Sequence, residues 1–302
     1  MRLIAWLYRS IGYRFAAFLV RPIVFYFFLT DRNGRRASLD YLSRLHATPA
    51  GARALGRVPR LRDSLRHYQA FGESVLDRVG IWLGTGHRFS VEIEGAEHLA
   101  HLIQGGRGGL ILGAHVGSFD AMRLLAQQAS PRAVKILMYT AHAARIGELF
   151  RQLGELSGSS SEMGVIEVRA GSFEHVLEVR RCIDRGEVVA ILADRVHPHE
   201  RAGSRAVRFL GATALLPESP IRLAAVLGCP VVVMAGLRMA PRRYAIVVES
   251  FAERVGIPRG SSEELTRLCQ RYADWLERMC ARAPLQWFNF YDFWATTAGT
   301  DR

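Results

Sequence analysis

A histidine and an acidic residue stand five positions apart twice in this chain, at His115 and Asp120 and at His87 and Glu92. Histidine titrates near neutral pH, and a carboxylate that binds one ring nitrogen leaves the other nitrogen ready to take a proton. Such a pair can activate a hydroxyl group. With ten histidines and 28 acidic residues in 302, about one such spacing is expected by chance, so only the surroundings can distinguish the two pairs.

The surroundings of Glu92 favour a solvated strand face. Glu92 alternates with the apolar residues Val91 and Ile93, a period of two that is typical of a half-buried strand. The pair of His87 and Glu92 is therefore interpreted as surface.

His115 follows the aliphatic run 109–114, which predicts a buried strand, and ligands of α/β sheets bind beyond the carboxyl ends of strands. The small neighbours, with Ser118 among them, leave room for a substrate. Asp120 stands where a helix is expected to begin, so it either caps that helix or orients His115. We predict His115 and Asp120 as catalytic residues and Ser118 as a substrate-binding residue.

The elements that must position these residues alternate between strand and helix from about residue 85. This alternation predicts an α/β fold with a mixed central sheet flanked by helices. Residues 242–251 are expected to form an antiparallel strand, and residues 261–284 a long helix with a capping box from Ser261 to Glu264. We expect residues 31–302 to form one domain, helical over 31–84 and α/β over 85–302.

Residues 1–30 are expected to form a helical, membrane-associated extension. They lack the ~20 uninterrupted apolar residues of a spanning helix. As a helix, residues 2–21 gather four arginines on one side and apolar residues on the other, a pattern typical of a helix lying in a membrane interface. Pro22 is expected to end this helix before a second apolar run, 23–29. The alternative is a helix packed on the protein's own core.

The net charge of +12 and the isoelectric point near 10.3 indicate a polyanionic partner, either nucleic acid or an anionic membrane surface. Basic residues are spread along the chain without a nucleic-acid-binding motif, so we expect a membrane and no nucleic acid. The four cysteines form no C-x-x-C pair, which argues against a zinc site or a disulfide framework.

Other kinds of site are less well supported. The chain has no G-x-S-x-G elbow. The glycines at the start of the run 105–113 come before a strand and not between a strand and a helix, which is the wrong order for a dinucleotide fingerprint. His197, His199 and Glu200 could supply metal ligands, but a proline-containing surface loop is the favoured interpretation.

Four blocks together resemble the bacterial lipid A biosynthesis acyltransferases, the lauroyl and myristoyl transferase group of the glycerolipid acyltransferase superfamily. They are GAHVGSFDAMRLL (113–125), RGEVVAILADR (185–195), VRFLGATALLPESPIRLAAVLGCPVVVM (207–234) and PLQWFNFYDFW (284–294). The resemblance covers most of the chain and implies the family's mixed α/β fold with a membrane-associated N-terminus.

The resemblance implies transfer of a fatty acyl chain, with acyl carrier protein favoured over coenzyme A as the donor. The acceptor would be a lipid hydroxyl at the cytoplasmic face of the inner membrane. His115 would be the general base and Asp120 its orienting carboxylate, while Asp194, Arg195 and Glu218 would join Ser118 in binding substrate. For Arg195 a surface ion pair, and for Glu218 a helix cap, are the structural alternatives. No metal or other cofactor is implied.

Two departures from the family's patterns leave the acceptor open. The FPEG block of the lysophosphatidate acyltransferases is missing, which argues against lysophosphatidate. The family's C-terminal block usually carries basic residues after its tryptophan, whereas here it is aromatic and contains Asp292. We therefore keep a lipid of an aryl-polyene pigment pathway as an alternative to lipid A. A thioesterase or lipid hydrolase, and a non-catalytic lipid-binding membrane protein, also remain as alternatives.

Overall fold

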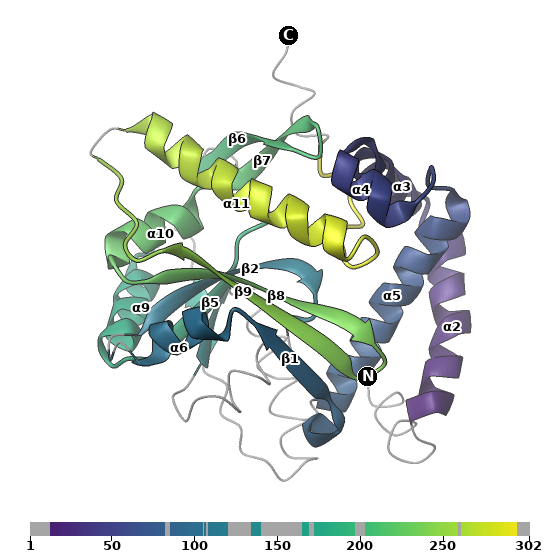
Figure 1. Cartoon of the computed structure of the whole chain (residues 1–302), viewed down its shortest axis with the longest axis horizontal. Coiled ribbons are helices and arrows are strands. Elements are labelled where there is room, and N and C mark those ends of the chain that lie inside the picture. Colours follow the sequence, from purple (N-terminus) through teal and green to yellow (C-terminus); the bar gives the residue numbers. More distant parts are fainter. Residues whose placement is uncertain are drawn as a thin grey trace.

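From Ser90 onward, the computed structural model consists of strands interspersed with helices (Figure 1). It describes residues 13–81, 85–104, 106, 108–119, 134–139, 165–168, 172–196, 203–258 and 261–294. Within these ranges seven strands form one sheet in the order β1-β9-β8-β2-β5-β3-β4, and β6 and β7 form a separate antiparallel pair. The α/β fold with a mixed central sheet, predicted from the alternation, is confirmed.

The described strands of the large sheet are four to ten residues long, and β8 and β9 have ten each. They are β1 (Ser90–Glu94), β2 (Gly109–Gly117), β3 (Val134–Tyr139), β4 (Val165–Val168), β5 (Val188–Leu192), β8 (Val231–Ala240) and β9 (Arg243–Ala252). Neighbours pair in parallel except β8 and β9, which are antiparallel, as the sequence predicted for residues 242–251. The separate pair consists of β6 (Ser204–Phe209) and β7 (Ala212–Pro217).

The described helices fall into an N-terminal group and a group that covers the sheet. The first group is α2 (Tyr13–Thr30), α3 (Arg32–Ala47), α4 (Pro49–Leu55) and α5 (Leu61–Gly80); the second is α6 (Ala96–Gln104), α9 (Glu174–Asp184), α10 (Ser219–Leu227) and α11 (Ser262–Arg282), with the single turn η2 (Gly86–Arg88) between the groups. Ser261 caps α11 by accepting from the Glu264 amide, while the Glu264 carboxylate binds Arg267 and does not complete the predicted capping box.

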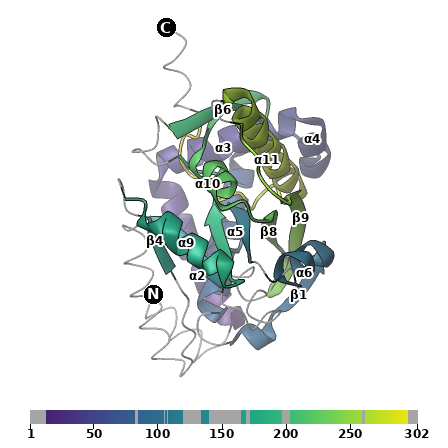
Figure 2. The ribbon, with the colours of Figure 1, turned by 90° about the vertical axis from the view of Figure 1, so that its left-hand side faces the viewer.

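The sheet is covered on both faces, which explains why its central strands are apolar along their whole length. On β2, Leu110, Leu112 and Ala114 face a core shared with α9, α10 and α11. Ile111 faces the opposite side, where it packs with Leu102 of α6. Figure 2 shows these helices on the two sides of the strands. In β1, by contrast, exposed residues alternate with half-buried ones, and Glu92 is exposed as predicted.

Helix α2 runs along the outer side of α5, so that α5 lies between α2 and the sheet (Figure 1). Val24 of α2 lies so close to Gly72 that a Cβ atom there would come within 2.4 Å of it, so the helices meet at a residue without a side chain. The sequence-based prediction that Pro22 ends the first helix is wrong, because α2 continues through it. Packing of Val24 and Phe28 on α5 offsets the hydrogen bond that proline cannot make.

Candidate active site

His115 lies near the carboxyl end of β2, where the regular pairing with β8 is interrupted between Gly113 and Gly117. Gly117 has a φ of 71°, and a Cβ atom there would meet the Gly236 carbonyl at 2.1 Å, so the chain leaves the strand through a conformation that suits glycine. The His115 side chain keeps 30% of its surface exposed. This end of β2 therefore presents an imidazole that a substrate can reach.

Asp194 follows β5, the parallel neighbour of β2, and its carboxylate binds His115 twice. Oδ1 lies 2.7 Å from His115 Nδ1, and Oδ2 accepts from the His115 backbone N–H at 3.0 Å. Oδ2 also accepts from the indole Nε1–H of Trp287 at 3.0 Å. A side chain that is completely buried thus receives three hydrogen bonds.

The charge state of Asp194 determines which nitrogen of His115 can act as a base. Burial alone raises the pKa of this carboxyl, but His115, the positive charge of Arg195 and the Trp287 donor outweigh it and hold the pKa well below its usual range. Because the ionised carboxylate can only accept, Nδ1 of His115 carries the proton that faces it. Nε2 is then the basic nitrogen, and no described residue hydrogen-bonds it.

Some of the residues predicted from the sequence cannot be placed in the site. Asp120 lies outside the described residues, as do His197, His199 and Glu200. In the part of the chain that is described, no three His, Cys, Asp or Glu side chains gather as a metal site would require.

Two expected substrate-binding carboxylates are instead bound within the protein. Asp194 is buried and its oxygens are taken by His115 and Trp287, so it is not available to a substrate. Glu218 is buried at the start of α10, where it forms ion pairs with Arg205 and Arg222. It makes no side-chain cap of α10 either, because its carboxylate is turned to these two arginines.

Ser118 and Arg195 follow the neighbouring strands β2 and β5. Ser118 directly follows β2, is fully buried, and donates its backbone N–H to Gly236 at 2.7 Å. Arg195 is half-buried; one terminal N–H donates to the Phe288 carbonyl at 2.7 Å, and the guanidinium lies 5.6 Å from the ring centre of Tyr291. Other terminal N–H groups of Arg195 can bind an anion, since guanidinium has five donors.

Residues 286–288, which we call the 286–288 segment, pair with the end of β2. The Gly117 amide donates to the Gln286 carbonyl at 2.8 Å, and the Phe288 amide donates to the His115 carbonyl at 3.0 Å. Trp287, between them, is completely buried and forms an antiparallel bridge with Val116. The segment thus fixes the backbone of His115 and brings the Trp287 indole to Asp194.

The sequence-based interpretation did not identify Trp287 as part of the site. Packing is part of the role of the aromatic block 284–294, since the Trp287 ring contacts Tyr41, Phe209 and Phe293. The remaining signal was a tryptophan inside a block shared with the family. The bond to Asp194 joins residues 93 positions apart, which no local spacing reveals.

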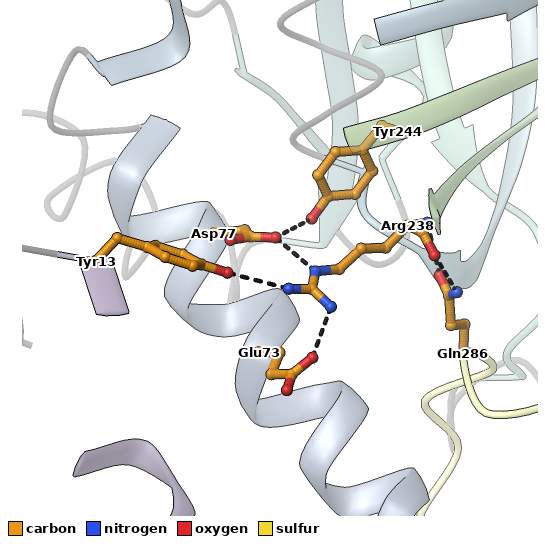
Figure 3. Close-up of polar contacts among 6 residues, drawn as sticks. All are labelled: Tyr13, Glu73, Asp77, Arg238, Tyr244 and Gln286. Atoms are coloured by element: carbon orange, nitrogen blue, oxygen red, sulfur yellow. Dashed lines mark hydrogen bonds and ion pairs between the residues drawn. The ribbon is translucent and has the colours of Figure 1, made fainter. Parts of the chain in front are cut away.

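A part-buried polar network anchors the 286–288 segment to α2 and α5 (Figure 3). Arg238 of β8 exchanges backbone hydrogen bonds with the Gln286 side chain at 2.8 and 2.7 Å. Its guanidinium binds Asp77 at 2.7 Å, Glu73 at 2.6 Å and the Tyr13 hydroxyl at 3.0 Å.

Tyr244 of β9 completes this network by donating to Asp77 at 2.8 Å. Burial, followed by the negative charge of Asp77, raises the pKa of the Tyr244 hydroxyl, which therefore stays protonated as a donor. The network connects α2 and α5 to the two antiparallel strands beside the site.

An imidazole held by a buried carboxylate at the carboxyl edge of an α/β sheet is an arrangement that can deprotonate a hydroxyl, the first requirement of acyl transfer. The comparison with known families agrees with this class. The pattern of the bacterial lipid A biosynthesis acyltransferases matches residues 77–296, and the chain belongs to that family. The protein is an acyltransferase, for which the family implies an acyl donor and a lipid acceptor. No curated protein matches the chain at a significant level.

Proposed function

We propose that the protein is a membrane-associated O-acyltransferase that uses His115 as its general base. It moves a fatty acyl chain from the thioester of acyl carrier protein to a hydroxyl of a lipid A precursor or a related bacterial outer-membrane lipid. One observation carries the proposal: Nδ1 of His115 is held at 2.7 Å by the ionised, buried Asp194, which leaves Nε2 as the base on a part-exposed side chain.

The reaction requires two proton movements that one imidazole can perform. Nε2 takes the proton of the acceptor hydroxyl as its oxygen attacks the thioester carbonyl carbon. The new C–O bond forms, the C–S bond of the tetrahedral intermediate breaks, and the imidazolium returns the proton to the departing sulfur. The products are an ester and the free thiol of the carrier. During these steps the negative charge of Asp194 stabilises the imidazolium.

Arg195 is proposed to bind an anionic group of the substrate. Its positive charge stands next to Asp194 in the chain. One terminal N–H of its guanidinium donates to the Phe288 carbonyl oxygen at 2.7 Å, in the segment that pairs with the end of β2. A guanidinium offers paired N–H groups that match phosphate or carboxylate. The described residues favour this over the surface ion pair that the sequence left open, since no carboxylate forms a salt bridge with Arg195 there.

Helix α2 supports association with a membrane surface. Seven of its apolar side chains are at least two-fifths exposed: Phe15, Phe18, Ile23, Phe25, Tyr26, Phe27 and Leu29. Aromatic side chains on an exposed helix face are typical of helices that lie in a bilayer interface. Among the residues that the structure describes, no helix has the length and apolar character needed to cross a bilayer. We place the enzyme at the cytoplasmic face of the inner membrane, where acyl carrier protein is available.

Product analysis tests the proposed function. Purified enzyme is mixed with radiolabelled acyl-acyl carrier protein and vesicles that contain extracted bacterial outer-membrane lipids, and the labelled products are separated. We expect the label to appear in an acylated lipid. Free fatty acid as the main product, despite the presence of acceptor lipid, would instead identify a thioesterase. Mass spectrometry of lipids from a deletion strain then names the acceptor, as the lipid that lacks one acyl chain.

A further inference from the structure

His67 is a completely buried histidine at which the N-terminal group of helices contacts the 286–288 segment. It lies on α5, and its Nε2 is 2.9 Å from the carbonyl oxygen of Trp287. Its Nδ1 is 3.0 Å from the hydroxyl of Ser38 on α3. Both ring nitrogens are thus engaged, by groups from two other parts of the chain.

The partners of His67 determine its tautomer. A carbonyl oxygen can only accept, so Nε2 carries the hydrogen and donates it to Trp287. Nδ1 is then the acceptor, and the Ser38 hydroxyl donates to it. Burial lowers the pKa of His67 to about 4, so this neutral form persists at physiological pH.

Hydrogen bonds to the main chain of Trp287 fix the position of this residue. Its carbonyl oxygen accepts from His67 and from the Asn289 amide, the latter at 2.7 Å. From the same residue the indole Nε1–H reaches Oδ2 of Asp194. A shift of the Trp287 main chain would therefore move the donor away from the carboxylate that orients His115.

We propose that His67 is a positioning residue for acyl transfer, which acts through the Trp287 main chain to aim the indole donor at Asp194. The inference rests on the proposed role of His115 as base. His67 itself touches neither His115 nor Asp194 in the structure; it contacts Ser38, Trp287 and the rings of Tyr41, Phe288 and Phe290.

The aromatic surroundings explain why packing alone does not account for a histidine at this position. Rings of Tyr41, Phe288 and Phe290 lie within 6.1 Å of the imidazole, so an apolar ring would suit this environment. Burying a polar ring without hydrogen bonds costs free energy, and the two bonds of His67 remove this cost only in one orientation. That orientation is the one that holds the Trp287 carbonyl.

Two matched variants separate the two contacts of His67. In His67→Gln the amide nitrogen stands near the position of Nε2 and can still donate to Trp287. In His67→Asn the shorter side chain reaches Ser38 but not Trp287. We expect kcat of His67→Gln to stay within about threefold of the native value, since one exchanged hydrogen bond changes little free energy.

For His67→Asn we expect kcat to fall by about 10- to 100-fold, because small displacements of catalytic groups have effects of this size. KM for both substrates should stay unchanged, since His67 touches no substrate. The rates are measured with acyl-acyl carrier protein and lipid vesicles and are divided by the folded fraction. Urea unfolding, monitored by tryptophan fluorescence, gives this folded fraction. A purely structural role would lower the folded fraction of His67→Asn and leave kcat per folded molecule native.

Either of two outcomes would overturn the inference: native kcat per folded molecule in His67→Asn, or an equal loss of kcat in both variants. Failure of the proposed function looks different. In that case the native enzyme forms no acylated lipid, or His115→Ala transfers as well as the native enzyme, whatever the His67 variants do.

Discussion

Trp287 donates its indole N–H to Oδ2 of Asp194 at 3.0 Å, and so supplies the third hydrogen bond to a carboxylate that is fully buried beneath His115. The other two donors belong to His115 itself. The geometry of the proposed base therefore depends on a residue from the C-terminal segment of the chain. This dependence can be tested separately from the base.

Trp287→Phe should lower kcat while it preserves the fold. Phenylalanine keeps the aromatic contacts with Tyr41, Phe209 and Phe293 but removes the donor to Asp194. Hydrogen bonds to charged groups contribute about 1.5–3 kcal/mol, so we expect kcat to fall roughly 10- to 100-fold. Steady-state kinetics with acyl-acyl carrier protein measures this change. Trp294→Phe, in the same aromatic cluster, is the matched control, and an equal loss there would mean that packing alone explains the effect.

Asp194 should contribute stability that disappears in acid. Its pKa in the folded protein lies below the usual aspartate value of 3.8, so the unfolded chain binds more protons as the pH falls through that value. The stabilisation is fully present above the unfolded pKa and is lost as the pH falls toward the folded pKa. Urea unfolding of the native protein and of Asp194→Asn between pH 3 and pH 7 checks this. The native protein should lose more free energy of unfolding below about pH 4.5 than the variant does, and parallel curves would contradict the expectation.

His67 should make stability depend on pH at a higher range. Its pKa is about 4 in the folded protein, against 6.5 for an unperturbed histidine, so between these values the unfolded chain binds the extra proton. The free energy of unfolding should therefore fall as the pH drops from 6.5 toward 4, by about 3 kcal/mol in total. His67→Gln should flatten this part of the curve. His87→Gln, which changes an exposed histidine, should leave the slope unchanged.

Arg238→Met should strongly destabilise the protein. The substitution leaves the carboxylate of Asp77 completely buried without its charged partner, and losses of about 3–5 kcal/mol are typical of such a change. Urea unfolding at neutral pH measures the free energy. Adding Asp77→Asn removes the uncompensated charge and should recover part of the loss. Arg243→Met, at an exposed position of β9, is the control, and a comparable loss there would contradict the assigned role of the network.

Phe27→Glu should weaken binding to membranes. Phe27 is 57% exposed on α2, and a charge placed there opposes insertion of that helix face into a lipid interface. Co-sedimentation with vesicles of phosphatidylethanolamine and phosphatidylglycerol measures the bound fraction, which should fall several-fold. Phe173→Glu is the matched control, since Phe173 is 81% exposed next to α9 and should not matter. Equal binding by both variants would argue against α2 as the membrane-facing element.

Periodicity predicted the order and type of the elements well, because the sheet is built from strands with clear apolar runs. β2 and β9 are examples: an uninterrupted buried strand and an antiparallel return, both evident from residue type. The continuation of α2 through Pro22 was not predictable from local rules. The helix continues because Val24 and Phe28 pack against α5, and that contact joins segments about forty residues apart in the sequence.

The candidate site was predictable only in part, for a similar reason. The position of His115 at a strand end follows from the aliphatic run before it. Asp194 was singled out as a substrate-binding residue from the resemblance. Its contact with His115 was not predicted, because that contact depends on the parallel pairing of β2 and β5, which the sequence of neither strand reveals. Trp287 and His67 reach the site only through tertiary contacts, so their side-chain types alone indicated nothing about the site.

The most direct test of the account compares two histidines that share the same spacing to an acidic residue. His115→Gln and His87→Gln are purified alongside the native enzyme, and the initial rate of acyl transfer from acyl-acyl carrier protein to lipid vesicles is measured. We expect His87→Gln to transfer at the native rate and His115→Gln to be slower by about 10²–10⁴-fold, the usual contribution of a general base. A folded His115→Gln enzyme that transfers acyl chains at the native rate would contradict the proposed role of His115.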